Sequence, residues 1–156
     1  MGHVLTLPAL VRVRRRLGRQ KKTVVFTNGT FDILHRGHVE YLAAARCMGD
    51  ALIVGLNSDA SIRRIKGKGR PINPARDRAA VLTALACVDY VCMFTADTPL
   101  AMIRRLIPDV LVKGADWKTT QIVGRELVEA HGGVVRTIRL TPGRSTTGVI
   151  ARVLRN

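Results

Sequence analysis

Residues 24–38 are Val-Val-Phe-Thr-Asn-Gly-Thr-Phe-Asp-Ile-Leu-His-Arg-Gly-His, a stretch in which an apolar run passes into a polar turn with two histidines. The run 24–27 has the composition of a short strand that is buried on both faces of a sheet. After the turn, Val39 and Leu42 have the spacing of one helix face, which predicts a helix over 36–48. A buried strand followed directly by a helix is typical of a parallel α/β sheet.

The same alternation continues toward the end of the chain. Four more strands are expected at the aliphatic runs 52–56, 90–94, 110–112 and 134–140. Helices are expected from residue 59 and over 73–86, 98–106, 121–131 and 145–154. With no internal repeat or interdomain linker, the sequence predicts a Rossmann-like, doubly wound sheet of five parallel strands with helices on both faces, in a single domain over residues 1–156.

Three helix starts have sequence signals of their own. Asn73-Pro74 and Thr98-Pro99 each place an N-cap residue before a proline, which suits the first position of a helix. Ser145 is the expected N-cap of the last helix.

The charge of the chain is strongly basic and unevenly distributed. Lys and Arg number 26 against 11 Asp and Glu, which gives a net charge of +15. Seven of these cations and no acid precede Asp32, and the basic segment 1–22 is expected to form a helix on the surface. Such a charge indicates a polyanionic partner, either nucleic acid or ligands that carry several phosphates. The low aromatic content of 4% argues against a protein that stacks single-stranded bases.

Targeting and redox signals are absent from the sequence. No apolar run approaches the roughly 20 residues of a membrane-spanning helix, and the N-terminal charges follow the apolar part, unlike those of a signal peptide. We therefore expect a cytoplasmic protein without a membrane partner. Cys47, Cys87 and Cys92 include no C-x-x-C pair, so we expect reduced, buried thiols with no metal or redox role.

The polar turn after the first strand is the leading candidate site, because doubly wound folds bind ligands beyond the carboxyl ends of their strands. His35 and His38 are three residues apart and would share a face in the first turn of a helix. Gly37 leaves space beside that turn, and backbone N–H groups at a helix start attract anions. Two imidazoles there could donate hydrogen bonds to a phosphate. A zinc site is disfavoured because no third ligand has suitable spacing, and neither the dinucleotide fingerprint nor the P-loop pattern is present.

Three further segments are candidates for binding phosphate or nucleotide. Ser145, Thr146 and Thr147 would start the last helix, where hydroxyls and free N–H groups can form a second anion site, although a serine N-cap alone would have the same pattern. The loop with Lys66, Lys68 and Arg70, and Arg78 nearby, could close over pyrophosphate or simply be solvated. Lys113, Gly114 and Asp116 follow the fourth strand, and Trp117 comes next.

The pattern T-x-G-T-F-D followed by H-x-G-H resembles the cytidylyltransferase-like nucleotidyltransferases. The resemblance implies that His35 and His38 bind the triphosphate and stabilise the transition state. It also implies three groups of site residues, which overlap. The catalytic group is His35, His38, Lys66, Ser145 and Thr146. The nucleotide-binding group is Asn28, Gly29, Thr30, Phe31, Gly37, His38, Lys113, Gly114, Asp116, Ser145, Thr146 and Thr147. The substrate-binding group is Thr30, Asp32, Lys68, Arg70 and Arg78. No residue is assigned to a metal, and Mg²⁺ is expected on the triphosphate.

Within this superfamily the sequence is most similar to the adenylyltransferase half of bifunctional ADP-heptose synthases and to its stand-alone counterparts. The similarity runs through TNGTFDILHRGHVEYLAAAR, KGKGRPINP and LVKGADW, although Thr30 stands where this group usually has Cys. It implies that ATP and the sugar phosphate D-glycero-β-D-manno-heptose 1-phosphate give ADP-heptose and pyrophosphate. The product would be used for lipopolysaccharide or another heptose glycan. The resemblance also implies that the protein is a homodimer. Alternatives within the superfamily are a glycerol 3-phosphate cytidylyltransferase and a flavin mononucleotide adenylyltransferase. An alternative of another class is a basic nucleic-acid-binding module, although we expect no nucleic-acid partner.

Overall fold

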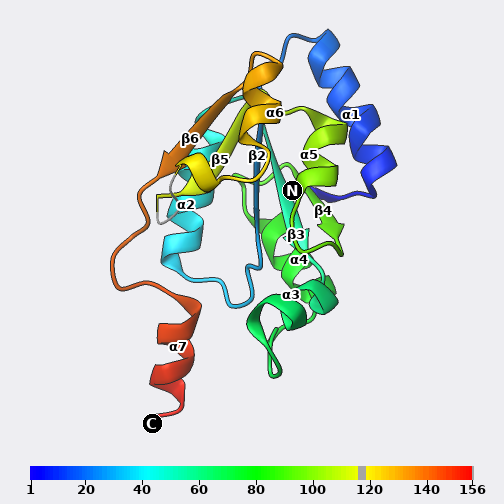
Figure 1. The fold of residues 1–156 in the computed structure, drawn as a ribbon. Helices are drawn as coiled ribbons and strands as arrows, with labels where there is room; N and C mark the ends of the chain where they lie inside the picture. The colour runs from blue at the N-terminus through cyan, green and yellow to red at the C-terminus, as the bar shows by residue number, and fades with distance from the viewer. Residues whose placement is uncertain (116–118, 156) are drawn as a thin grey trace.

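Strand β2 (Val24–Gly29) lies at the centre of a parallel sheet in the computed structural model, which describes residues 1–115 and 119–155. The strand order is β1-β4-β3-β2-β5-β6 (Figure 1). The other five strands are β1 (His3–Val4), β3 (Ala51–Asn57), β4 (Tyr90–Phe94), β5 (Val110–Gly114) and β6 (Val134–Ile138). Every neighbouring pair in the sheet is parallel, as the alternation of strands and helices predicts.

Helices cover both faces of this sheet, because alternate residues of each strand point to opposite sides. The helices are α1 (Leu7–Arg19), α2 (Arg36–Arg46), α3 (Asp59–Lys66), α4 (Ala75–Ala84), α5 (Leu100–Leu106), α6 (Arg125–Ala130) and α7 (Thr146–Val153), with a 3₁₀ turn η1 (Thr119–Gln121). Val25 of β2 belongs to a core cluster with Leu42 of α2 and Leu82 of α4. Its neighbour Phe26 belongs to a second cluster on the other face, with Leu10 of α1. The predicted covering of both faces is therefore confirmed.

The sheet has six strands, so the expected number of five is wrong. The additional strand β1 is only two residues long and pairs His3 and Val4 with Tyr90 and Val91 at the edge of the sheet. A strand of two residues is too short to show a hydrophobic period, which is why the sequence does not reveal it. The basic segment does form a helix, but α1 also contributes the fully buried Leu10 to the core.

The structure differs from the sequence prediction at the starts of two helices, and it divides one helix that was expected to be continuous. Pro74 and Pro99 are themselves the N-cap residues of α4 and α5, one position later than expected. Asn73 does not cap α4, because its backbone N–H and side-chain amide both donate hydrogen bonds to Asp32. The helix expected over 121–131 is divided by Gly124, whose φ of 87° is incompatible with helical backbone.

The order of the strands places a topological switch point beside β2. After β2 the chain adds β3 and β4 on one side of it, then crosses over and adds β5 and β6 on the other side. The carboxyl ends of β2 and β5, at Gly29 and Gly114, therefore border the crevice in which such folds bind ligands.

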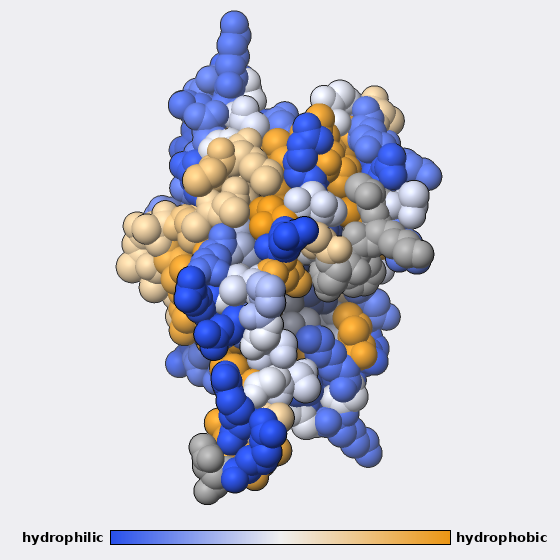
Figure 2. All heavy atoms as spheres, turned by 90° about the vertical axis from the view of Figure 1, so that its left-hand side faces the viewer, coloured by the Kyte–Doolittle hydropathy of each residue, from blue (hydrophilic) through white to orange (hydrophobic). Residues whose placement is uncertain are grey.

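The C-terminal helix α7 projects from one end of the molecule (Figures 1 and 2). At this end apolar atoms lie between hydrophilic ones (Figure 2). Val153 and Leu154, at the end of the chain, are 70% and 80% exposed. Ser145 is the N-cap residue of α7, as predicted. Among residues 1–115 and 119–155, no helix is both long and apolar enough to cross a membrane.

Candidate active site

The two histidines lie at the start of α2, where the structure stacks their rings. His35 is the N-cap residue with extended backbone, and His38 is in the first turn. The ring centroids are 3.8 Å apart and the ring planes differ by 21°. The expected shared face of these residues is thus realised as a direct ring contact at the switch point.

Burial keeps both imidazoles uncharged near neutral pH. Desolvation lowers the pKa of His38 to about 4, helped by the charges of His35 and Lys66 and opposed by a backbone hydrogen bond with Ile33. Desolvation also lowers the pKa of His35, with a smaller contribution from Arg144. The Nδ1 atoms of both rings are buried and have no hydrogen-bond partner. A neutral imidazole carries one N–H donor, so each ring can offer at most one donor to an anion.

The turn between β2 and α2 is shaped by Gly29 and Phe31. Phe31 has a φ of 42°, in the left-handed region that side chains other than glycine adopt only when their surroundings enforce it. Its ring packs edge-on against His38, with centroids 5.3 Å apart. A Cβ on Gly29 would lie 2.9 Å from this ring. Gly29 is therefore required for Phe31 to support His38.

Two cavities meet at the ends of β2 and β5. One of about 180 Å³ is lined by His38, Tyr41 and Gly114, and one of about 340 Å³ by Asn57, Lys66 and Ile122. Both are also lined by Asn28, Gly29, Thr30 and Lys113. The Oδ1 atom of Asn28 is buried without a hydrogen-bond partner. Together the cavities have the size and the mixed polar lining of a small-molecule site.

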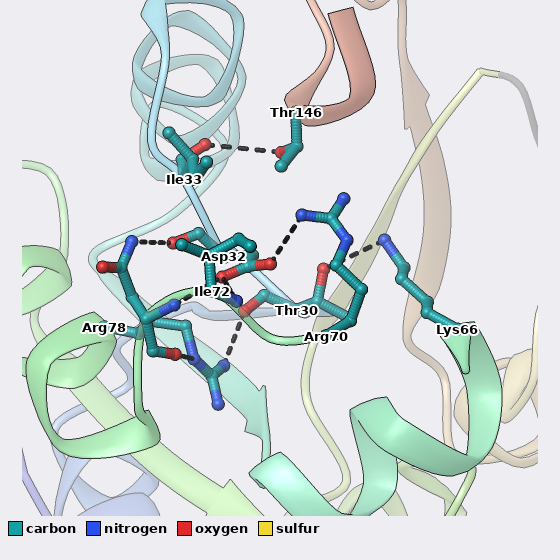
Figure 3. A network of polar contacts seen from close by, with 9 residues as sticks. Thr30, Asp32, Ile33, Lys66, Arg70, Ile72, Arg78 and Thr146 are labelled. Carbon is teal, nitrogen blue, oxygen red and sulfur yellow. Dashed lines mark hydrogen bonds and ion pairs between the residues drawn. The ribbon is translucent and has the colours of Figure 1, made fainter. Parts of the chain in front are cut away.

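Asp32 holds the basic loop against this turn (Figure 3). Its side chain is almost fully buried and forms an ion pair of 2.8 Å with Nη1 of Arg70. It also accepts hydrogen bonds from the backbone N–H groups of Ile72 at 2.8 Å and Asn73 at 3.0 Å. The structure therefore brings the two predicted substrate-binding residues Asp32 and Arg70 together, but as partners of each other.

Arg78 supports the same turn from inside the protein. Its side chain is fully buried and donates to the carbonyl oxygens of Thr30 at 2.6 Å and Asn73 at 2.9 Å. It also forms an ion pair of 2.6 Å with Asp59. A direct contact between Arg78 and a substrate would require the guanidinium to give up one of these partners. Its geometry is that of a residue that fixes the backbone of Thr30.

Lys66 reaches the site from the end of α3. Its Nζ donates to Oγ1 of Thr30 at 3.4 Å (Figure 3). Desolvation lowers the pKa of this ammonium group, Arg70 lowers it further, and Asp32 opposes the shift. Lys68, two residues later, is exposed and is not among the residues that line the two cavities.

The last predicted anion site adjoins the histidine turn. Oγ1 of Thr146 donates to the carbonyl of Ile33 at 3.4 Å (Figure 3). Ser145 accepts the backbone N–H of Gly148 at 3.0 Å, which makes it an N-cap, while Thr147 is exposed. This arrangement places the first turn of α7 beside the loop that leads to His35.

The segment before α7 crosses the start of α2 and occupies the space beside Gly37. Thr141 donates a hydrogen bond of 2.5 Å to Glu40. A Cβ on Gly37 would lie 3.2 Å from both the Cβ of Arg144 and Nδ1 of His35. Gly37 thus allows close packing of these two residues, where the sequence predicts space for a phosphate or a ribose. Asp116 and Trp117 lie outside the described residues.

Sequence reasoning missed residues that the structure places in or under the cavities. Tyr41 lines the smaller cavity and Thr98 the larger one. Thr27 is fully buried and shares a hydrogen bond of 2.7 Å with the hydroxyl of Tyr41. One signal for Tyr41 was available, since it follows His38 by three residues and lies on the same helix face.

The sequence matches the family described as cytidylyltransferase-like over residues 26–152. The bifunctional protein HldE of Syntrophotalea carbinolica is 52% identical over 97% of this chain and 32% of the relative. The bifunctional protein HldE of Campylobacter concisus is 59% identical over 85% of this chain and 27% of the relative. The chain spans a third or less of the length of these relatives.

Two solved structures resemble the fold. The lipopolysaccharide core biosynthesis protein of Thermoplasma volcanium has a TM-score of 0.63 at 29% identity, covering 77% of this chain and 97% of its own. Pantoate-beta-alanine ligase of Francisella tularensis has a TM-score of 0.65 over 100% of this chain and 80% of its own. Its identity of 13% supports a likeness of fold alone.

Proposed function

The chain belongs to the cytidylyltransferase-like family, and from this premise we propose that it is a nucleotidyltransferase that adenylates a sugar phosphate. The proposed reaction transfers AMP from ATP to D-glycero-β-D-manno-heptose 1-phosphate and releases pyrophosphate. The observation that carries the proposal is the stacked pair of neutral histidines, His35 and His38, at the switch point beside β2. The choice of a heptose rests on the sequence resemblance and on the high identity to the HldE proteins.

The mechanism requires positioning more than covalent chemistry by the protein. A sugar phosphate with a second pKa of about 6 is mostly dianionic at neutral pH, so it can attack without a general base. One of its oxygens forms a bond to the α-phosphorus of ATP while the bond from that phosphorus to the bridging oxygen breaks. The electron pair leaves with pyrophosphate. N–H groups of His35 and His38 would bind the oxygens on which charge develops.

The cationic side chains near this turn would bind the outer phosphates. Lys66 is held beside Thr30, and Thr146 presents the start of α7 on the other side of the turn. An ammonium group in a partly buried site stabilises leaving pyrophosphate more strongly than one in water. Lys68 remains a candidate for the same role when ligands are bound, since it lies in the same loop.

Mg²⁺ would be bound mainly by triphosphate oxygens and water. Within residues 1–115 and 119–155, no group of three or more His, Cys, Asp and Glu side chains is placed to hold a metal ion. Mg²⁺ commonly keeps several waters and takes its remaining ligands from substrate phosphates. The ion would neutralise charge on the β- and γ-phosphates. Since the reaction consumes ATP, we place it in the cytoplasm, and we expect a homodimer, which light scattering would test.

The decisive experiment measures pyrophosphate release with Mg²⁺ for every combination of two nucleotides and three acceptors. The nucleotides are ATP and CTP, and the acceptors are heptose 1-phosphate, glycerol 3-phosphate and flavin mononucleotide. Activity with ATP and heptose 1-phosphate alone would support the proposal. Activity with another pair would retain the nucleotidyltransferase and reject the heptose.

The net charge of +15 keeps a nucleic-acid-binding module as the second candidate. Arg14 and Lys22 are engaged in ion pairs with Asp109 and Asp50. Other cations of the N-terminal segment are exposed, namely Arg12, Arg15, Arg16, Arg19 and Lys21. Nucleic-acid binding would give an affinity for unrelated oligonucleotides that falls steeply with salt, and no pyrophosphate release. We expect weak binding of oligonucleotides and measurable release of pyrophosphate.

A further inference from the structure

A buried hydrogen bond joins the strand and the helix that form the two walls of the site. Thr27 lies on β2, directly before Asn28 and Gly29, and is fully buried. Tyr41 lies on α2, three residues after His38, and is 7% exposed. Their hydroxyl oxygens are 2.7 Å apart.

The position of this bond fixes how the histidine face of α2 meets the end of β2. Tyr41 and His38 are successive residues on one helix face, and both line the smaller cavity. Asn28, which follows Thr27, lines the same cavity. A hydrogen bond between hydroxyl groups is directional, whereas the apolar contacts around it allow the helix to slide or rotate slightly. The bond therefore sets the distance from His38 to the backbone of β2.

We propose that the Thr27–Tyr41 hydroxyl pair positions His38 for adenylyl transfer, with Tyr41 as a positioning residue. This inference rests on the proposed function, because it assigns the pair a role in that reaction. Near the optimum geometry, small displacements of a catalytic group have large effects on rate. Loss of the bond should therefore lower kcat more than it alters the KM for ATP.

The test compares Tyr41→Phe, Thr27→Val and the double variant. Each single variant removes the bond between the two buried hydroxyls and should lower Tm by several degrees. The double variant replaces both hydroxyls by apolar groups of nearly the same shape, so its Tm should return toward that of the wild type. The matched control is Tyr90→Phe, since Tyr90 lies on β4 and packs with the core cluster on the other face of the sheet.

Two measurements separate positioning from a purely structural role. The first is kcat for pyrophosphate release, which should fall at least about tenfold in both Tyr41→Phe and the double variant. The second is the NMR titration of the His38 ring, which should move toward an ordinary histidine value in the same variants. The exposed His131 provides an internal reference in each spectrum.

The outcomes distinguish this inference from the proposed function. An unchanged His38 titration in the double variant, or a double variant with wild-type kcat, would overturn the positioning role. A wild-type protein that releases no pyrophosphate with any substrate pair would reject the proposed function. In that case the His38 titration alone decides whether the hydroxyl pair positions the ring.

Discussion

The rings of His35 and His38 are stacked 3.8 Å apart at the start of α2, and the pKa of each is lowered mainly by burial. The contact places two neutral imidazoles side by side where the switch point opens. Protonating either ring would bring a positive charge next to its neighbour, which contributes to the low pKa of His38. The pair is thus suited to donate hydrogen bonds to an anion and is poorly suited to carry charge before the anion binds.

Replacing either histidine should therefore abolish most of the activity. We expect His35→Ala and His38→Ala each to lower kcat by about 10²–10³-fold, the usual loss when one donor to a developing oxyanion is removed. The double variant should lose less than the product of the two effects, because the rings act as a unit. Initial rates of pyrophosphate release provide the measurement.

His131→Ala is the matched control for these variants. His131 is exposed at the end of α6, where its Nδ1 lies 2.8 Å from the carbonyl of Leu127. Its replacement should leave kcat unchanged. Near-normal turnover in both site variants would remove the histidines from the mechanism.

The low pKa of His38 also predicts how stability depends on pH. The ring binds a proton near pH 6.5 in the unfolded chain but only near pH 4 in the folded protein. Between these values the unfolded state binds more protons, so the free energy of unfolding falls as the pH is lowered. Between about pH 7.5 and about pH 5, protonation of His38 alone should lower the free energy of unfolding by about 2 kcal/mol.

Urea unfolding of the wild type and His38→Asn at the two pH values would measure this effect. The asparagine variant lacks the titrating ring, so its stability should fall less over the same range. Equal losses in both proteins would show that His38 titrates normally in the folded state.

The sequence was most informative where local pattern and position agree. The apolar run of β2 and the H-x-G-H spacing after it together predicted a strand, a helix and two histidines on one face, because each depends on residues close in the chain. The positional rule for doubly wound sheets also made Lys113 and Gly114, far along the chain, candidate site residues, and the structure places both in the cavity lined by His38.

Contacts between distant side chains could not be predicted in the same way. The resemblance implied substrate binding for Asp32, Arg70 and Arg78, and the sequence indicated no partners for them within the protein. The structure pairs Asp32 with Arg70 and buries Arg78 between Thr30 and Asp59. A charged residue in a sequence carries no signal of whether its partner is a ligand or another side chain. The Thr27–Tyr41 bond likewise depends on the packing of α2 on β2, which no local pattern specifies.

The bonds of Asp32 predict that its carboxylate is needed for stability and for loop closure. Asp32→Asn would lose the ion pair with Arg70 and leave that cation, which is 15% exposed, uncompensated. We expect a loss of about 2–4 kcal/mol in the free energy of unfolding, since breaking a buried pair on one side is strongly destabilising. The loop with Lys66 and Lys68 would also loosen, which should raise the KM for the sugar phosphate.

Chemical denaturation and steady-state kinetics would measure the two effects. Asp77→Asn is the control, because Asp77 is exposed and its nearest cation, Arg76, is 3.9 Å away. It should change neither quantity. A stable Asp32→Asn protein with unaltered KM would mean that the loop is held by other contacts.

Gly37 gives a prediction in which helix propensity and site geometry oppose each other. Alanine is favoured over glycine inside a helix by about 1 kcal/mol. At position 37, however, the new methyl group would lie 3.2 Å from the Cβ of Arg144 and from Nδ1 of His35. Gly37→Ala should therefore gain little stability and should lower kcat, because the His35 ring is pushed out of its stack.

Gly18→Ala in α1 is the control. The new methyl group meets only the far end of the Arg14 side chain, so this variant should be neutral or stabilising with unchanged kcat. Thermal unfolding and pyrophosphate release would be measured for both variants. A Gly37→Ala protein that is stabilised and fully active would show that His35 and Arg144 can move apart without loss of function.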